Sequence, residues 1–197
     1  GTLQGRCALL HAIAPIEFNA INLALGMITR FGPDAVLPLS MRETFADDWV
    51  SVADDEARHF GLICDRLEQL GMHYGDLTAH NGLWEAAEAT KNNIAARLAI
   101  APLVLEARGL DVTPGMITKL ERCGDTESAQ ILHIIYTDEI GHVAIGSKWF
   151  HEVAKMLEKQ PKTYFKTLVK TYFKGQLKPP FNDQARILAG LPMSYYS

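Results

Sequence analysis

Two short stretches decide the fold: Asp55-Glu-Ala-Arg-His59 and Asp138-Glu-Ile-Gly-His142. Each places a glutamate three residues before a histidine, and this spacing puts both side chains on one face of an α-helix. Apolar residues recur around both stretches at intervals of three and four, and alternating strand-like runs are absent. The pattern predicts two long helices, from about 40 to 71 and from about 126 to 157, each with such a pair near its middle.

Two further long helices each contribute a lone glutamate. Glu17 lies in a predicted helix over 3–31 and Glu106 in one over 81–109. They precede the glutamates of the quoted stretches by 39 and 33 residues. The order Glu, Glu-x-x-His, Glu, Glu-x-x-His therefore forms a pseudo-repeat of two helical hairpins. We predict an all-α fold, a four-helix bundle with additional short helices.

Capping residues set the expected helix boundaries. Ser40 and Glu43 match a capping box at the start of the second helix. Thr113-Pro114 predicts a separate short helix over 114–123, because proline is favoured at the first helical position. The remaining signals are a stop at Gly124, a cap at Asp125, a helix from Pro161 to Gly175 and a cap at Asn182. We expect one domain over 1–197, with a core at about 3–157 and a helical extension over 158–197.

The lone glutamates lie among apolar neighbours, so all four helices are expected to turn carboxylates into the core. Four buried, ionised carboxylates without cations would be very unfavourable. Two divalent ions would balance their charge, and oxygen-rich ligation with two imidazoles favours iron or manganese. This ligand set is recognised as that of di-iron carboxylate bundles. The candidate ligands are Glu17, Glu56, His59, Glu106, Glu139 and His142; no other residue is assigned a catalytic role.

Asp55 and Asp138 each precede a motif glutamate. A metal-bound histidine usually donates its second N–H to a carboxylate. We therefore predict that Asp138 pairs with His59 and Asp55 with His142, each across two helices. The alternative is that both aspartates are ordinary surface acids.

The surrounding residues resemble ferritin-like di-iron proteins. The phrases at 11–17, 52–60, 105–116 and 141–147 are most similar to an uncharacterised ferritin-like family, number 455 among the domains of unknown function. The similarity extends from about residue 6 to 190, and the ligand pattern is similar to that of bacterial tRNA isopentenyladenosine hydroxylase, rubrerythrins and bacterioferritins. In place of the histidine usual in the family phrase, this chain has Pro15. Pro15 and Pro102 either widen the bundle near the site or only bend their helices.

The resemblance implies a non-haem dinuclear iron oxidoreductase, with iron at both positions or manganese beside iron. It would activate dioxygen or peroxide to oxidise or hydroxylate a small-molecule or nucleoside substrate, with an external electron donor. Three alternatives stay open: a tRNA-modifying hydroxylase, a ferroxidase or iron-storage protein, and a catalytically inactive bundle. A homodimer is one of the assemblies left open.

The net charge of −4 conceals a basic segment, since residues 150–197 hold 8 basic and 3 acidic residues. Five lysines there recur every four residues, a step that keeps side chains on one slowly drifting helical stripe. The stripe either binds RNA phosphates, an acidic partner or the chain's own acidic bundle, or is a solvated face. These lysines are Lys162, Lys166, Lys170, Lys174 and Lys178.

The composition is that of a globular protein, with 48% hydrophobic and 21% charged residues. No uncharged apolar stretch of about 18 residues occurs, which argues against a membrane-spanning helix. No signal peptide is visible. Three cysteines without a Cys-x-x-Cys pair predict neither disulfides nor a cysteine zinc site, and a cytoplasmic location is expected.

Overall fold

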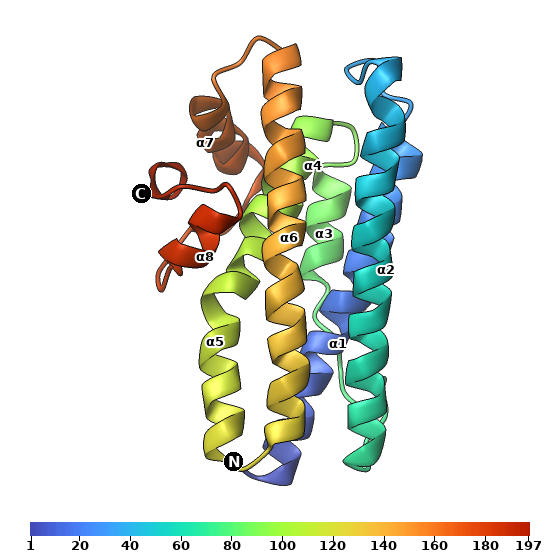
Figure 1. The fold of residues 1–197 in the computed structure, drawn as a ribbon, viewed down its shortest axis with the longest axis vertical. Coiled ribbons are helices and arrows are strands. Elements are labelled where there is room, and N and C mark those ends of the chain that lie inside the picture. The colour runs from blue at the N-terminus through green and yellow to red at the C-terminus, as the bar shows by residue number, and fades with distance from the viewer.

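The computed structural model describes all 197 residues, which form helices joined by turns, without strands. The all-helical class is thus confirmed. Four long helical segments run along the longest axis of the molecule (Figure 1). They are α1 (Leu3–Gly26) with the π-helical turn η1 (Met27–Phe31), α2 (Leu39–Gln69), the run α4 (Ile94–Ile100), η2 (Ala101–Glu106) and α5 (Ala107–Arg122), and α6 (Thr126–Met156). The shorter elements are α3 (Gly82–Ala89), α7 (Pro161–Tyr172), α8 (Asp183–Leu188) and the 3-10 turn η3 (Met193–Tyr195).

Several predicted boundaries are confirmed by their caps. The Asp125 side chain accepts a hydrogen bond from the Ser128 N–H at the start of α6, and Asn182 does the same for α8. Gly124 has a φ of +74°, which favours glycine, and it separates α5 from α6. Local side-chain chemistry is sufficient to place these helix ends.

Two other boundaries were predicted wrongly. Ser40 does not cap α2, because the helix already begins at Leu39, after the extended residue Pro38. The helix predicted over 81–109 is interrupted after Ala89 and begins again at Ile94. Asn93 has an extended backbone there, and its side chain accepts a hydrogen bond from Ala96 N–H, so it caps a new helix.

The short helix predicted over 114–123 is also wrong, because α5 runs without a break through Pro114. Proline has no N–H, so the carbonyl of Leu110, one turn earlier, loses its helical donor. The side-chain amide of Asn182 donates to that carbonyl at 3.1 Å. A distant residue of the C-terminal extension therefore supplies the hydrogen bond that allows the helix to continue.

The buried apolar residues form two large clusters, one toward each end of the long helices. Along α6, for example, Ile135 belongs to one cluster and Val143 to the other. The residues between the clusters include the predicted ligands: Glu17 in α1, the first Glu-x-x-His pair in α2 and the second in α6. A buried polar layer thus crosses the interior between two apolar layers.

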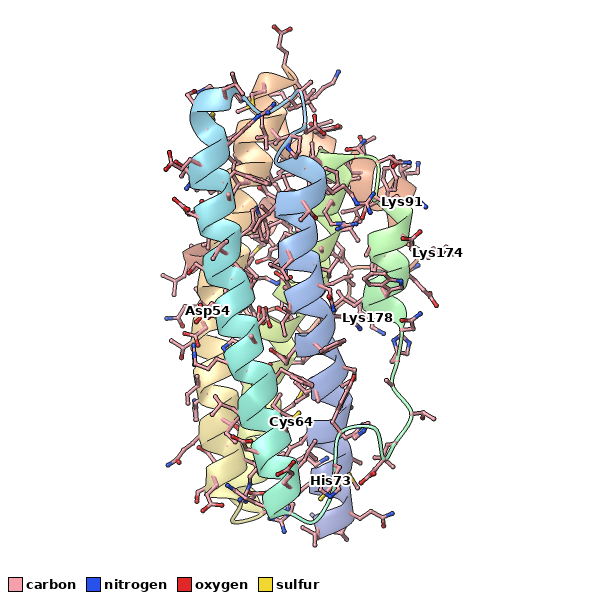
Figure 2. All side chains as sticks on the ribbon, turned by 90° about the vertical axis from the view of Figure 1, so that its right-hand side faces the viewer. Asp54, Cys64, His73, Lys91, Lys174 and Lys178 are labelled. Carbon is pink, nitrogen blue, oxygen red and sulfur yellow. The ribbon has the colours of Figure 1, made fainter.

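The C-terminal extension packs against the side of the long helices. Helix α7 contacts α4 and α6, and α8 contacts α5 and α6 (Figure 1). Helix α7 ends at Tyr172, so the predicted stripe of five lysines is only partly helical, and Lys174 and Lys178 lie beyond it. Lys174 borders a pocket beside α3. Lys174 and Lys178 are both labelled in Figure 2. All five lysines of the series are exposed.

The three cysteines are unpaired, as expected. The first helix, Leu3–Phe31, is long and apolar enough to cross a membrane by length and composition. Arg6 and Glu17 interrupt this helix, so it contains no uncharged stretch of about 18 residues. Of the most apolar 18 residues of this helix, 44% are buried inside the protein. One such helix is weak evidence, because core helices pass the same test, so the absence of a membrane span stays a prediction.

Candidate metal centre

The four long helical segments supply all six predicted ligands. Helix α1 carries Glu17, α2 carries Glu56 and His59, η2 ends with Glu106, and α6 carries Glu139 and His142. Five of these residues are less than a tenth exposed, and Glu106 is half-buried. Each Glu-x-x-His pair turns to the interior because positions three apart share a helix face.

Glu56 lies at the centre of the arrangement. Its Oε1 is 3.1 Å from Nδ1 of His142, and its Oε2 is 3.7 Å from Nδ1 of His59. The His59 Nδ1 is also 3.3 Å from Oε2 of Glu17, and the His142 Nδ1 is 3.9 Å from Oε1 of Glu139. One ligand atom from each of Glu17, Glu56, His59 and Glu139 lies within 4.8 Å of the others. One carboxylate thus connects the two histidines.

Glu106 is the least buried of the six predicted residues. Like His142 it is not in the group of four, but it borders the same cavity as Glu17, Glu56 and Glu139. It closes the π-helical segment η2, which begins beside Pro102. The π-helical turn displaces the side chains that follow it relative to a regular helix, and such turns are frequent at functional sites.

Pro15 does not remove Glu17 from the site. Helix α1 is continuous through Pro15, and Glu17 is only 4% exposed. Pro102 is accommodated by Gly146 of α6, where an added Cβ would come within 2.4 Å of the Pro102 Cβ. A glycine on α6 therefore permits the close approach of η2.

The buried polar atoms of the site are suited to hold cations. All six predicted ligands have at least one buried nitrogen or oxygen without a hydrogen-bond partner: Glu17 Oε2, both carboxylate oxygens of Glu56, His59 Nδ1, Glu106 Oε2, Glu139 Oε2 and His142 Nδ1. Buried polar groups are normally satisfied, so six residues with free atoms around one point are unusual. Metal ions placed among these atoms would satisfy them, and the residues therefore fit a metal centre.

Two aspartates hold the outer nitrogens of the histidines. His59 Nε2 is 3.0 Å from Oδ2 of Asp138, and His142 Nε2 is 3.3 Å from Oδ2 of Asp55. The predicted crossed pairs are thus present. When Nε2 carries the proton, Nδ1 of each ring is left with a free lone pair toward the interior.

Arg58 is a site residue that the sequence analysis missed. Its Nη2 donates to Oδ1 of Asp55 at 2.7 Å and to Oδ2 of Asp138 at 2.8 Å. It therefore joins the two carboxylates that orient the histidines. The contact with Asp55 follows from their spacing of three residues, whereas the contact with Asp138 crosses between α2 and α6.

Burial and mutual repulsion set the pKa values of the carboxylates. Desolvation, followed by repulsion from neighbouring carboxylates, raises the pKa of Glu106 well above its ordinary value, and desolvation also raises the pKa of Glu17 and Glu139. Burial alone would raise the pKa of Glu56 too, but the two histidines outweigh it and lower this pKa to about 2. The central carboxylate thus stays ionised.

Burial shifts the pKa of a histidine downward, which is opposite to its effect on a carboxylate. Desolvation alone would lower the pKa of each imidazole, but the surrounding carboxylates outweigh it. They raise the pKa of His59 to about 10 and that of His142 to about 12. Without metal, the cluster therefore holds protons that a metal ion would have to displace.

A cavity of about 130 Å³ reaches the centre from the carboxylate side. It touches four of the predicted ligands, Glu17, Glu56, Glu106 and Glu139, but neither histidine. Its walls come mainly from α1, α5 and α6, with single residues of α2 and α3 and two of η2, and just over half of the lining residues are hydrophobic. A small molecule in this cavity would lie against the carboxylates and away from the aspartates behind the histidines.

We expect Asp138→Ala to weaken metal binding by 10- to 100-fold, because His59 loses the partner that orients it. Isothermal titration with Zn²⁺ or Mn²⁺ measures the change. The control is Asp65→Ala, which removes an exposed carboxylate of the same charge from α2. Equal affinities for the Asp138 variant and the unchanged protein would contradict this role.

Comparison with known proteins gives a family and one relative. A family model described as "Protein of unknown function (DUF455)" matches residues 1–197. A protein of Haemophilus influenzae, named "Uncharacterized protein", is 46% identical over 189 residues. The match covers 96% of this chain and 66% of the relative, so the chain spans about two thirds of the relative's length. No solved structure matches the chain.

Proposed function

The chain belongs to the DUF455 family, and we propose that this member is a ferritin-like, non-haem di-iron oxidoreductase. The proposal includes a four-helix bundle formed by α1, α2, the α4–η2–α5 run and α6. The single observation that carries it is the set of unpartnered, buried donor atoms on six residues around one interior point.

Charge supports two divalent ions at this point. Four carboxylates and two neutral imidazoles are balanced by two divalent cations, whereas burial of the carboxylates alone would be strongly unfavourable. The donors are oxygen and imidazole nitrogen, without thiolate, and this set suits iron or manganese. Glu17, Glu56 and His59 would hold ions on one side, and Glu106, Glu139 and His142 on the other, with Glu56 placed to be shared.

Iron bound in such a site supplies one-electron and dioxygen chemistry that amino-acid side chains lack. For hydroxylation, one substrate C–H, one O₂, two electrons and two protons give one C–OH and one water. The electrons would come from an external donor. The chain's own part is to orient both imidazoles through Asp55 and Asp138 and to exclude bulk water with aliphatic cavity walls.

Two alternative functions use the same centre differently. Iron storage would require a hollow assembly of many chains, and the cavity beside the carboxylates favours a small-molecule substrate instead. The tRNA alternative relied on one stripe of five lysines, of which α7 carries only three. We therefore place oxidation of a small molecule first.

The direct test is to load the protein with Fe²⁺ without oxygen, remove excess metal and measure iron before admitting O₂. We expect about two iron ions per chain and an absorption change in the near ultraviolet after oxygen is added. A chain that holds no iron under these conditions would contradict the proposal, and so would bound iron that does not react with O₂ or peroxide.

A further inference from the structure

We infer that the substrate of this centre is a short hydrocarbon chain or ring that carries a carboxylate. The hydrocarbon part would fill the cavity beside the glutamates, and Arg108 would bind the carboxylate at the opening. The inference rests on the proposed function for the reaction, but the binding site itself is defined by the cavity and by Arg108.

The cavity wall selects an apolar group of limited size. Most of the aliphatic residues that line it come from α1, α5 and α6, among them Ile13, Ile16, Ala20, Val112, Leu132 and Ile135, and α3 and η2 add one leucine each. An apolar cavity of about 150 Å³ in another protein holds one benzene molecule. Part of the 130 Å³ here lies against the glutamates that would hold metal, so the cavity suits a group of at most about six carbon atoms. A nucleoside has more atoms and many polar groups, and such a wall could not satisfy them.

Arg108 is the one cationic side chain that lines the cavity. Its side chain is 37% exposed, and Arg108 also lines the neighbouring pocket between α5 and the C-terminal extension. Its Nη1 donates to the carbonyl oxygens of Lys178 and Pro180, at 3.1 and 2.9 Å. These backbone contacts from the C-terminal extension hold the guanidinium in place without neutralising its charge.

The nearest carboxylate to this guanidinium is already paired. Asp111 accepts from Arg186 at 2.8 and 2.7 Å, whereas Arg108 Nη1 is 3.5 Å from Asp111. The hydrogen bonds of Arg108 all use Nη1, which leaves Nε and Nη2 without a protein partner. A guanidinium with two free N–H groups on one edge is suited to bind a carboxylate with both oxygens.

The two features together define the ligand class. A cationic rim above an aliphatic wall favours a molecule with an anionic end and an apolar body. The apolar body would then lie next to the glutamates, where the proposed oxidation takes place. Neutral hydrocarbons and polar molecules of the same size are the competing classes, and the following experiment separates them.

The experiment titrates the Zn²⁺-loaded protein, which is redox-silent, with cyclohexanecarboxylate and with the neutral cyclohexylmethanol. Isothermal titration gives both affinities, and zinc is measured in each sample. We expect one molecule of the acid to bind per chain, at least tenfold more tightly than the alcohol. Arg108→Gln should lower affinity for the acid at least tenfold and leave affinity for the alcohol unchanged. Arg108→Lys should restore part of the loss.

Two further variants complete the design. Val112→Phe fills the cavity and should prevent binding of both molecules without changing the zinc content. Arg122→Gln, an exposed arginine on the same helix, should behave like the unchanged protein. Thermal unfolding of each variant shows whether the fold is retained.

Several outcomes would overturn the inference. Equal binding of the acid and the alcohol would show that Arg108 does not bind the carboxylate. An Arg108→Gln variant with full affinity for the acid would show the same. No binding of either molecule to fully zinc-loaded protein removes the substrate class but leaves the metal centre intact. If the chain takes up no metal, the proposed function fails. The same titrations on the metal-free protein then show whether the cavity and Arg108 still bind the acid.

Discussion

We expect the replacement of Glu56 by Gln to lower the bound metal from the proposed two equivalents per chain to fewer than one. Both oxygens of Glu56 are buried without hydrogen-bond partners, and each lies toward a different histidine. The amide keeps the size of the side chain but removes its charge and one of its two metal-binding oxygens. Because this residue is placed to be shared, the loss affects both ions, and oxidation activity should fall below detection.

The matched control is Asp54→Asn, which makes the same chemical change two residues earlier on α2. Asp54 is exposed and points away from the interior (Figure 2). Metal analysis after gel filtration, together with titration of each metal, compares the two variants. Two equivalents of tightly bound metal in the Glu56→Gln protein would show that this carboxylate is not the shared ligand.

If the proposed metal is bound, we expect its removal to make the protein less stable, by an amount that grows as the pH rises. In the metal-free fold, burial raises the pKa of Glu17, Glu106 and Glu139, and carboxylate contacts raise the pKa of His59 to about 10. The folded chain then holds more protons than the unfolded chain. Its stability therefore falls with rising pH.

The sign and window of this effect follow from the individual groups. The histidine contribution is complete below pH 6.5 and is lost as the pH rises toward 10, and the raised glutamates add a loss that begins above about pH 4.5. Glu56 acts in the opposite direction, but only as the pH falls from about 4.5 toward 2. Between pH 5 and 8 all the larger effects therefore lower the stability of the metal-free fold as the pH rises.

Metal ions replace those protons, so metal binding tightens over the same range. Ions at about 1,000 times their dissociation constant stabilise the fold by about 4 kcal/mol per site. For a chain of this size, each filled site therefore raises the Tm by about 10 °C, and two filled sites raise it by about 20 °C. Calorimetry of loaded and chelator-treated protein at pH 5, 6, 7 and 8 should show a difference that widens with pH. A constant difference, or one that narrows, would contradict the protonated cluster.

The sequence predicted much of the candidate site because its main signals are local. Positions three apart on a helix share a face, so Glu56 with His59 and Glu139 with His142 could be paired without a structure. The crossed pairs with Asp55 and Asp138 followed from the same register. The caps at Asp125 and Asn182 were also predictable, since a capping side chain needs only its own first turn.

One error arose where a local signal was overruled by a distant residue. Thr113-Pro114 has the composition of a helix start, yet the Asn182 amide bonds the carbonyl of Leu110 and α5 continues. The regular step of the five lysines continues in the sequence after α7 has ended. At Pro114 a distant residue decided the outcome, whereas α7 ends because the backbone turns extended at Phe173, two residues before Gly175.

The sequence by itself determined the helical class, the boundaries set by caps, and which face of each long helix carries the carboxylates and histidines. The tertiary structure alone decided how deep Glu56 lies between the two histidines, that Arg58 joins the two aspartates, and that Arg108 stands at the rim of an apolar cavity. The reason is physical: an α-helix has 3.6 residues per turn, so the face on which a residue lies follows from its position in the sequence. The separation and rotation of packed helices depend on side chains brought together from the whole chain.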